Sequence, residues 1–145
     1  MENFSIQVQI RWADLDPNFH LRHSVYYDWG ALCRVEFFNK IGFSTEMMGK
    51  HQLGPILLRE ECIFRKEIRS EDKIEIDLKI VKAKKDFSRF TIQHEIKKND
   101  NVLSAIITVD FAWMDMTIRK LGSLPDEFQK ILSASPKTEN FHWVD

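Results

Sequence analysis

Four side chains that can move protons or bind ligands lie within ten residues near the start of the chain. They are Asp14, Asp16, His20 and His23, in the stretch RWADLDPNFHLRHSVYYDWGALCRVEFF. Pro17 fixes its own φ and biases Asp16 towards extended geometry, so we expect the Asp16 carboxylate to be held in a loop. A helix starting near His23 and Ser24 has unpaired backbone N–H groups and the positive end of its dipole there. A carboxylate beside such N–H groups suits chemistry at a carbonyl, because the N–H groups stabilise an oxyanion.

The same residues allow other interpretations. The two aspartates with His20 and His23 can ligate a metal ion, but the sequence has no HExxH motif or Cys/His cluster to supply further ligands, and we predict no metal site. Asp16 can also be a turn or capping residue. Asp14 is expected to be structural, bonding nearby N–H groups or Arg11.

The flanking segments predict the elements that hold this loop. Phe4, Ile6, Val8, Ile10 and Trp12 alternate with polar residues, which indicates a strand with one buried face. From Val25 to about Ile41, apolar residues recur at three- and four-residue steps, which predicts a helix. We expect Ser24 to cap its start and Gly42 to end it.

The rest of the chain reads mostly as strands. Apolar-rich or alternating segments cover residues 56–68, 74–80, 90–96 and 103–113, and polar turns at 69–72, 84–86 and 98–101 separate them. A short helix is expected near residues 126–132, after Pro125. The sequence therefore predicts an α+β fold, a five-stranded antiparallel sheet wrapped around one long central helix.

Composition excludes several classes of protein. The 145 residues suit one domain, over residues 1–145, and the net charge of −1 gives no global field for nucleic acid or an anionic membrane. No segment has the roughly 18 apolar residues needed to cross a bilayer, and the first residues do not form a signal peptide. Cys33 and Cys62 lie in apolar segments without a CxxC motif, so we expect buried thiols in a cytoplasmic protein.

The stretch from Arg11 to Phe38 resembles the signature of hotdog-fold acyl-CoA thioesterases of the 4-hydroxybenzoyl-CoA thioesterase type. Arg11, Asp14 and Asp16 match the R-x-x-D-x-D loop of that family, and Tyr26, Arg34 and Glu36 match its helix; this helix match continues into the following strands. The resemblance implies a single hotdog domain that hydrolyses acyl-CoA or acyl-carrier-protein thioesters. It also implies no cofactor, since coenzyme A is part of the substrate, and a homodimer or homotetramer with active sites at the dimer interface.

The resemblance assigns roles to individual residues. Asp16 would be the catalytic carboxylate, as nucleophile or as base for water, and the backbone N–H near His23 would hold the carbonyl oxygen. Phe19 replaces a frequent glycine of the family, which implies a reshaped pocket mouth. We expect Phe19, His20 and Tyr26 to contact substrate. Glu36 is expected to be partly buried, because its period places it beside Leu32 and Cys33, and to approach the acyl group; it ranks second to Asp16 as a base.

A second group of candidates lies far along the chain. Lys84, Lys85 and Arg89 surround a turn and can meet the phosphates of coenzyme A by charge-assisted hydrogen bonds, or else form a solvated turn. His94 is expected to be a core histidine with its hydrogen bonds satisfied, and Glu60 and Glu61 to form salt bridges.

Two other functions are compatible with this sequence. One is a hotdog hydratase or dehydratase acting on acyl thioesters, which would use His20 or His23 with a carboxylate. The other is a non-catalytic acyl-ligand-binding protein, suggested by Phe19 and its altered neighbours. The Asp-x-Asp-Pro loop favours the hydrolase.

Overall fold

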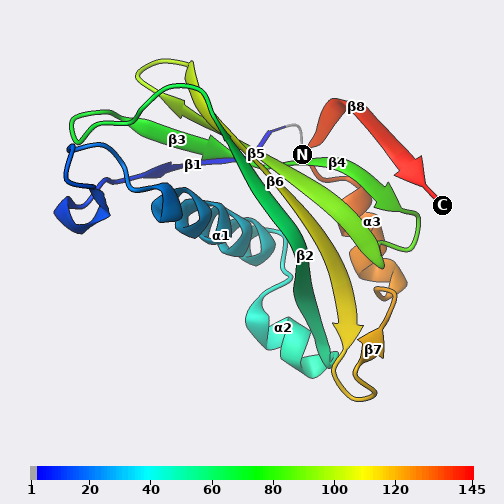
Figure 1. Cartoon of the computed structure of the whole chain (residues 1–145). Coiled ribbons are helices and arrows are strands. Elements are labelled where there is room, and N and C mark those ends of the chain that lie inside the picture. Colours follow the sequence, from blue (N-terminus) through cyan, green and yellow to red (C-terminus); the bar gives the residue numbers. More distant parts are fainter. Residues whose placement is uncertain (1–2) are drawn as a thin grey trace.

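A computed structural model describes residues 3–145, and Figure 1 shows its course. The first half contains β1 (Ser5–Val8), a short 3-10 helix (Trp12–Asp14), α1 (His23–Lys40), α2 (Thr45–Lys50) and β2 (Leu53–Phe64). The second half contains β3 (Ile74–Asp77), β4 (Lys79–Lys84), β5 (Arg89–Lys98), β6 (Val102–Asp115), β7 (Lys120–Leu121), α3 (Asp126–Ser133) and β8 (Lys137–Val144). None of these helices is both long and apolar enough to span a membrane, within the described residues.

The sheet confirms the predicted antiparallel arrangement and extends it. β2 pairs with β6, β6 with β5, and β5 with both β3 and β4. β3 and β4 are the single strand predicted over 74–80, interrupted at Leu78, whose N–H donates to the Phe4 carbonyl (3.2 Å). β1 lies antiparallel beside β3, and β8 lies parallel beside β4. The short strand β7, the strand β8 and the helix α2 were not predicted.

The long helix packs on one face of the curled sheet (Figure 1). Its buried residues come in adjacent pairs one turn apart, Val25 with Tyr26, Trp29 with Gly30, Cys33 with Arg34, and Phe37 with Phe38. This periodicity places one stripe of the helix against the sheet. The opposite stripe stays open, with Leu32 at 43% and Val35 at 49% exposure. The predicted helix is thus confirmed, but the sheet covers only one side of it.

Two details of the predicted first strand are wrong. β1 ends at Val8, and the following residues turn into the 3-10 helix instead of continuing the alternation. Trp12 is therefore not buried but is 78% exposed. The physical reason is the Arg11–Asp14 contact, which folds the chain back on itself over three residues.

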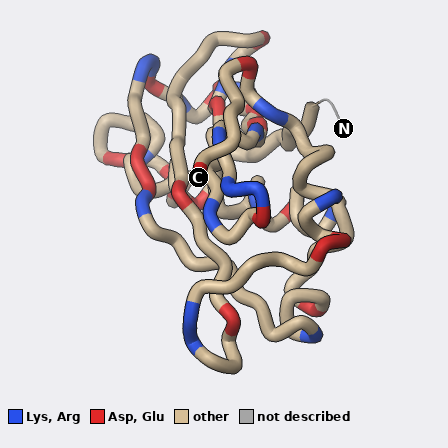
Figure 2. The backbone as a smooth tube through the Cα atoms, turned by 90° about the vertical axis from the view of Figure 1, so that its right-hand side faces the viewer, with Lys and Arg blue, Asp and Glu red and all other residues tan. Residues whose placement is uncertain are grey.

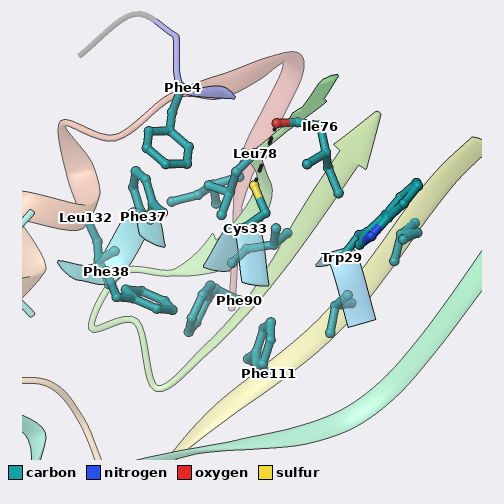
Figure 3. Close-up of a cluster of buried hydrophobic side chains, with 14 of the residues drawn as sticks. Phe4, Trp29, Cys33, Phe37, Phe38, Ile76, Leu78, Phe90, Phe111 and Leu132 are labelled. Carbon is teal, nitrogen blue, oxygen red and sulfur yellow. Dashed lines mark hydrogen bonds between the residues drawn. The ribbon is translucent and has the colours of Figure 1, made fainter. Parts of the chain in front are cut away.

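Aromatic and aliphatic side chains of both layers form the core (Figure 3). Cys33 faces the carbonyl of Ile76, at 3.8 Å from its sulfur, and burial raises the pKa of this thiol to about 12. Cys62 is half-buried, and burial raises its pKa to about 11. The predicted buried thiol is thus confirmed for Cys33, whereas Cys62 is only partly buried; both cysteines are free and stay protonated at neutral pH.

Candidate active site

The loop after the 3-10 helix is closed around Asp16. The Asp16 N–H donates to the His20 carbonyl (2.8 Å), and the Phe19 N–H donates to the Asp16 carbonyl (2.9 Å). Oδ1 of Asp16 accepts the backbone N–H groups of Asn18 (2.8 Å) and His20 (3.1 Å), an arrangement typical of Asx turns. Within residues 3–145, Oδ2 accepts no hydrogen bond. One oxygen thus fixes the carboxylate and the other is available.

Asp14 anchors the loop to its surroundings, as predicted for a structural residue. Its carboxylate accepts from Arg11 Nη2 (2.8 Å) and from the Arg11 backbone N–H (2.9 Å), while its own carbonyl accepts the Arg22 N–H (2.8 Å). The hydrogen bond from the Arg11 guanidinium holds the pKa of Asp14 below its usual range. Asp14 is 1% exposed, and the hydrogen bond from the Arg22 N–H to its carbonyl ties the loop to the start of α1.

The start of α1 leaves donors without partners. The N-cap is Arg22 and not Ser24, whose hydroxyl instead accepts from Arg22 Nε (3.1 Å). The N-cap prediction was wrong because helical geometry begins two residues earlier than predicted, at His23, so Ser24 lies inside the helix. Val25 N–H donates to the Arg22 carbonyl (3.0 Å), whereas His23 and Ser24 N–H have no such partner among the described residues. These N–H groups and the helix dipole can hold a negatively charged oxygen.

Tyr26 closes one side of this region. It is 4% exposed, and its ring packs edge-on against Phe64 with centroids 4.9 Å apart. Burial, with the neighbouring Cys62 and Asp16, raises the pKa of Tyr26 to about 12. The phenol therefore stays neutral and able to donate a hydrogen bond. Phe64 ends β2 and is 53% exposed, so the site lies beside an open edge of the sheet.

Phe19 occupies a backbone conformation that suits glycine. Its φ is 61°, in the left-handed region, and its side chain is 59% exposed with the ring 5.9 Å from that of Trp12. A left-handed residue at this point lets the loop close on Asp16. The glycine expected there from the family resemblance is thus explained by backbone geometry.

The other predicted substrate-binding residues are spread over the molecule. His20 Nε2 lies 3.3 Å from Glu67 Oε2. Glu36 is exposed, and its predicted partial burial is wrong because it lies on the open stripe of α1. It is thirteen residues from His23, about 20 Å along the helix axis. Within one protomer, Glu36 and the Asp16 loop are separate.

The basic turn lies at the opposite end of the sheet. Arg89 is level with Ala112 and Ile56, eight residues from Phe64 along β2, or about 27 Å. Lys84 and Arg89 line a cavity of about 450 Å³, together with Lys82 and Asp110. Lys85 lines a different cavity, beside α3. Figure 2 faces this side of the molecule and shows basic and acidic segments interspersed over it.

A buried polar network ties α1 to the sheet. Its members were predicted from the sequence only as separate residues. His94 is fully buried, and its Nδ1 donates to the Asp77 carbonyl (2.7 Å) while its Nε2 accepts from Arg34 Nη1 (3.1 Å). Arg34 Nη2 lies 3.6 Å from Glu60 Oε2. Burial and the Arg34 charge lower the pKa of His94 to about 3. The satisfied core histidine and the Glu60 salt bridge are thus confirmed.

The network needs a small neighbour on the helix. A Cβ at Gly30 would come within 3.2 Å of Arg34 Nη1. The glycine followed by an arginine one turn later was the signal available in the sequence.

As for metal ions, residues 3–145 contain no group of three or more His, Cys, Asp or Glu side chains arranged to hold one.

Comparisons with known proteins identify the family to which this chain belongs. A family model described as "Thioesterase-like superfamily" matches residues 10–132. No curated protein is significantly similar in sequence.

Several solved structures share the fold. A hypothetical protein from Staphylococcus aureus, solved in complex with CoA, superposes with a TM-score of 0.85 and 17% identity, over 91% of this chain and 82% of that one. A DHNA-CoA thioesterase from the same organism gives 0.82 and 18%, over 92% and 90%. A 1,4-dihydroxy-2-naphthoyl-CoA thioesterase from Synechocystis gives 0.81 and 17%, over 91% and 96%. These likenesses confirm the predicted hotdog fold.

Proposed function

The chain belongs to the thioesterase-like superfamily, and we propose that it hydrolyses acyl-CoA or acyl-carrier-protein thioesters with Asp16 as the catalytic carboxylate. One observation carries the proposal. Asp16 is fixed through Oδ1 by two backbone N–H groups while Oδ2 has no described donor, next to a helix start with unpaired N–H groups. The solved structures of similar fold include a CoA complex and two CoA thioesterases, which supports this substrate class.

The thioester carbonyl would lie between these two features. Its oxygen accepts from the N–H groups at His23 and Ser24, which stabilise the negative charge that develops as the carbonyl carbon becomes tetrahedral. Asp16 Oδ2 then either attacks the carbon, giving an acyl-aspartate that water hydrolyses, or takes a proton from the attacking water. Both routes release the free acid and the free thiol. The charge of Asp16 contributes, after burial, to the raised pKa of Tyr26, which keeps the phenol neutral in this region.

The working unit in this proposal is a homodimer, which can pair further into a homotetramer. Within the described part of the chain, β2 pairs with β6 alone, so its other edge is unpaired. Four apolar side chains of β2 are 49–53% exposed: Leu57, Leu58, Ile63 and Phe64. A long apolar edge strand tends to pair with a second strand. Antiparallel pairing of two β2 strands around a two-fold axis brings the start of one beside the end of the other. Each Asp16 loop would then lie at the interface.

This assembly would also give the basic turn a role. Lys84, Lys85 and Arg89 lie about 27 Å along the sheet from the Phe64 end of their own protomer. In the antiparallel dimer, the same turn lies towards the Asp16 loop of the neighbouring copy. The coenzyme phosphates would then be met by the protomer that does not supply Asp16.

The experiment that tests the proposed function is a thiol-release assay. Purified protein is mixed with acyl-CoA thioesters of increasing chain length, aryl-CoA thioesters and acyl-carrier protein, and free thiol is followed with a chromogenic disulfide. Release above the spontaneous rate for at least one class supports the proposal. No release from any class, or loss of an enoyl double bond without thiol release, contradicts it.

A further inference from the structure

The loop that holds Asp16 is tied to the connection between β2 and β3, which passes beside it (Figure 1). The Leu21 N–H donates to the Ile68 carbonyl (2.8 Å), and His20 forms an isolated antiparallel bridge with Arg69. Ile68 is fully buried, so this part of the connection is anchored in the core. A fixed segment therefore lies against the residue that closes the Asp16 loop.

Glu67 extends this contact from the backbone to the side chains. Its Oε1 accepts from Arg69 Nη2 (2.8 Å) and Nε (3.2 Å), and its Oε2 lies 3.3 Å from His20 Nε2. The Lys98 Nζ donates to the Glu67 carbonyl (2.5 Å), which holds the backbone at this position. Glu67 is thus fixed by two cationic partners and presents its second carboxylate oxygen to His20.

The contact between Glu67 and His20 requires a hydrogen on the imidazole. A carboxylate only accepts hydrogen bonds, so His20 Nε2 must be the donor. The hydrogen bond from the Arg69 guanidinium, and then His20, lower the pKa of Glu67, so its carboxylate is ionised at neutral pH. Hydrogen bonds to an ionised group are roughly twice as strong as those between neutral groups. Glu67 therefore holds the imidazole in one orientation.

The backbone of His20 in turn holds the Asp16 carboxylate. Its N–H donates to Asp16 Oδ1 (3.1 Å), and its carbonyl accepts the Asp16 N–H (2.8 Å). The preceding residue, Phe19, has a φ of 61°, a strained conformation that persists only where the surroundings enforce it. The side-chain contact to Glu67 comes directly after this strained residue. It therefore opposes the opening of the loop.

We propose that Glu67 and His20 are positioning residues, which keep the Asp16 loop closed and so aim Asp16 Oδ2 at the thioester carbonyl. The proposal rests on the proposed hydrolase function, which assigns the chemical step to Asp16. Neither side chain needs to touch the substrate. A displacement of about 1 Å at a catalytic group can reduce a rate about 100-fold. An exposed ion pair has little effect on global stability, so the effect is expected in the loop and in kcat.

The test compares variants of Glu67 in two assays. Glu67→Ala removes the contact, and Glu67→Gln keeps an oxygen that accepts from His20. The matched control is Glu127→Ala, because Glu127 also lies beside a histidine, with Oε1 3.9 Å from His51 Nε2, but at the start of α3. Thiol release gives kcat and KM for each protein. Amide hydrogen exchange by NMR, without substrate, reports loop opening through the N–H groups of Asp16 and His20.

The expected result separates positioning from binding. Glu67→Ala should lower kcat about tenfold, with KM within about twofold of the wild type, and should speed the exchange of both N–H groups about fivefold. Glu67→Gln and Glu127→Ala should stay within about twofold of the wild type in both assays.

Any of four results would overturn the inference: unchanged kcat in Glu67→Ala, a lower kcat without faster exchange, a raised KM with unchanged kcat, or a Glu67→Gln enzyme as slow as Glu67→Ala. Failure of the proposed function is distinguishable from these. It would leave every protein at the spontaneous rate of thiol release, while the exchange rates still differ between Glu67→Ala and the control.

Discussion

Acidification should weaken the fold through one residue, His94. The imidazole is held neutral in the core, donating to the Asp77 carbonyl and accepting from Arg34. Its pKa is about 3 in the folded protein, against an ordinary value of about 6.5 in the unfolded chain. Between these values the unfolded chain binds more protons than the folded one. The free energy of unfolding must therefore decrease as the pH falls below about 6.5, and the decrease ends when the pH reaches the pKa of His94 in the folded protein, about 3.

The size of the effect follows from the two pKa values. Each pH unit in this window costs about 1.4 kcal/mol of stability. Between pH 7 and pH 5 the contribution of His94 is about 2 kcal/mol, since its titration in the unfolded chain begins near pH 6.5. That is a large share of the 5–15 kcal/mol typical of a folded protein.

Urea unfolding at pH 7 and pH 5 measures this quantity, with His94→Gln as the matched variant. A glutamine can donate its amide to the Asp77 carbonyl and accept from Arg34, but it does not titrate. The wild type should lose about 2 kcal/mol more than His94→Gln on going from pH 7 to pH 5. Equal losses in the two proteins would refute the assignment of a neutral, buried His94.

Three further outcomes are expected. Because Phe19 has a positive φ, Phe19→Gly should be about 1 kcal/mol more stable than Phe19→Ala in thermal unfolding, and the opposite order would contradict the strained loop. Arg89→Ala should raise the KM for acyl-CoA about fivefold while leaving the KM for the acyl-pantetheine fragment unchanged; equal effects on both would exclude a phosphate contact. Ile63→Lys, on the open edge of β2, should give a folded monomer by light scattering with little thiol release, whereas an unchanged oligomer would place the interface elsewhere.

Much of the sheet was predictable because its strands alternate in the ordinary way. The segments 90–96 and 103–113 lie within β5 and β6, and the residues predicted to face inwards are buried except Leu103, which is partly buried. The long helix was equally clear from its periodicity. The length of the first strand was predicted wrongly because of a local contact. The strand stops at Val8 because Arg11 and Asp14 form hydrogen bonds over three residues, and this contact competes with strand pairing. α2 is too short for a periodic signal, yet its Met48 lines an apolar cavity together with Val35 and Phe38 of α1.

The candidate site was predictable only in part. The motif selected Asp16 and the helix start, but spacing alone could not show that Oδ1 is occupied and Oδ2 free, because that depends on how the loop closes. Glu36 was misjudged because apolar neighbours on a helix do not reveal which stripe the sheet covers. Lys84 and Lys85 are adjacent in sequence but line different cavities, because Lys84 is the last residue of β4 and Lys85 lies in the turn that follows it.

The most direct test of the central claim is the thiol-release rate of Asp16→Asn, measured on the best substrate of the panel. Asparagine keeps an oxygen to accept the N–H groups of Asn18 and His20, so the loop should stay closed while the carboxylate is lost. The matched control is Asp115→Asn, because Oδ1 of Asp115 also accepts two backbone N–H groups, from Thr117 (2.9 Å) and Ile118 (3.3 Å). Asp16→Asn should lower kcat by about 100-fold or more, with Asp115→Asn within about twofold of the wild type. An Asp16→Asn enzyme as fast as the control would contradict the account.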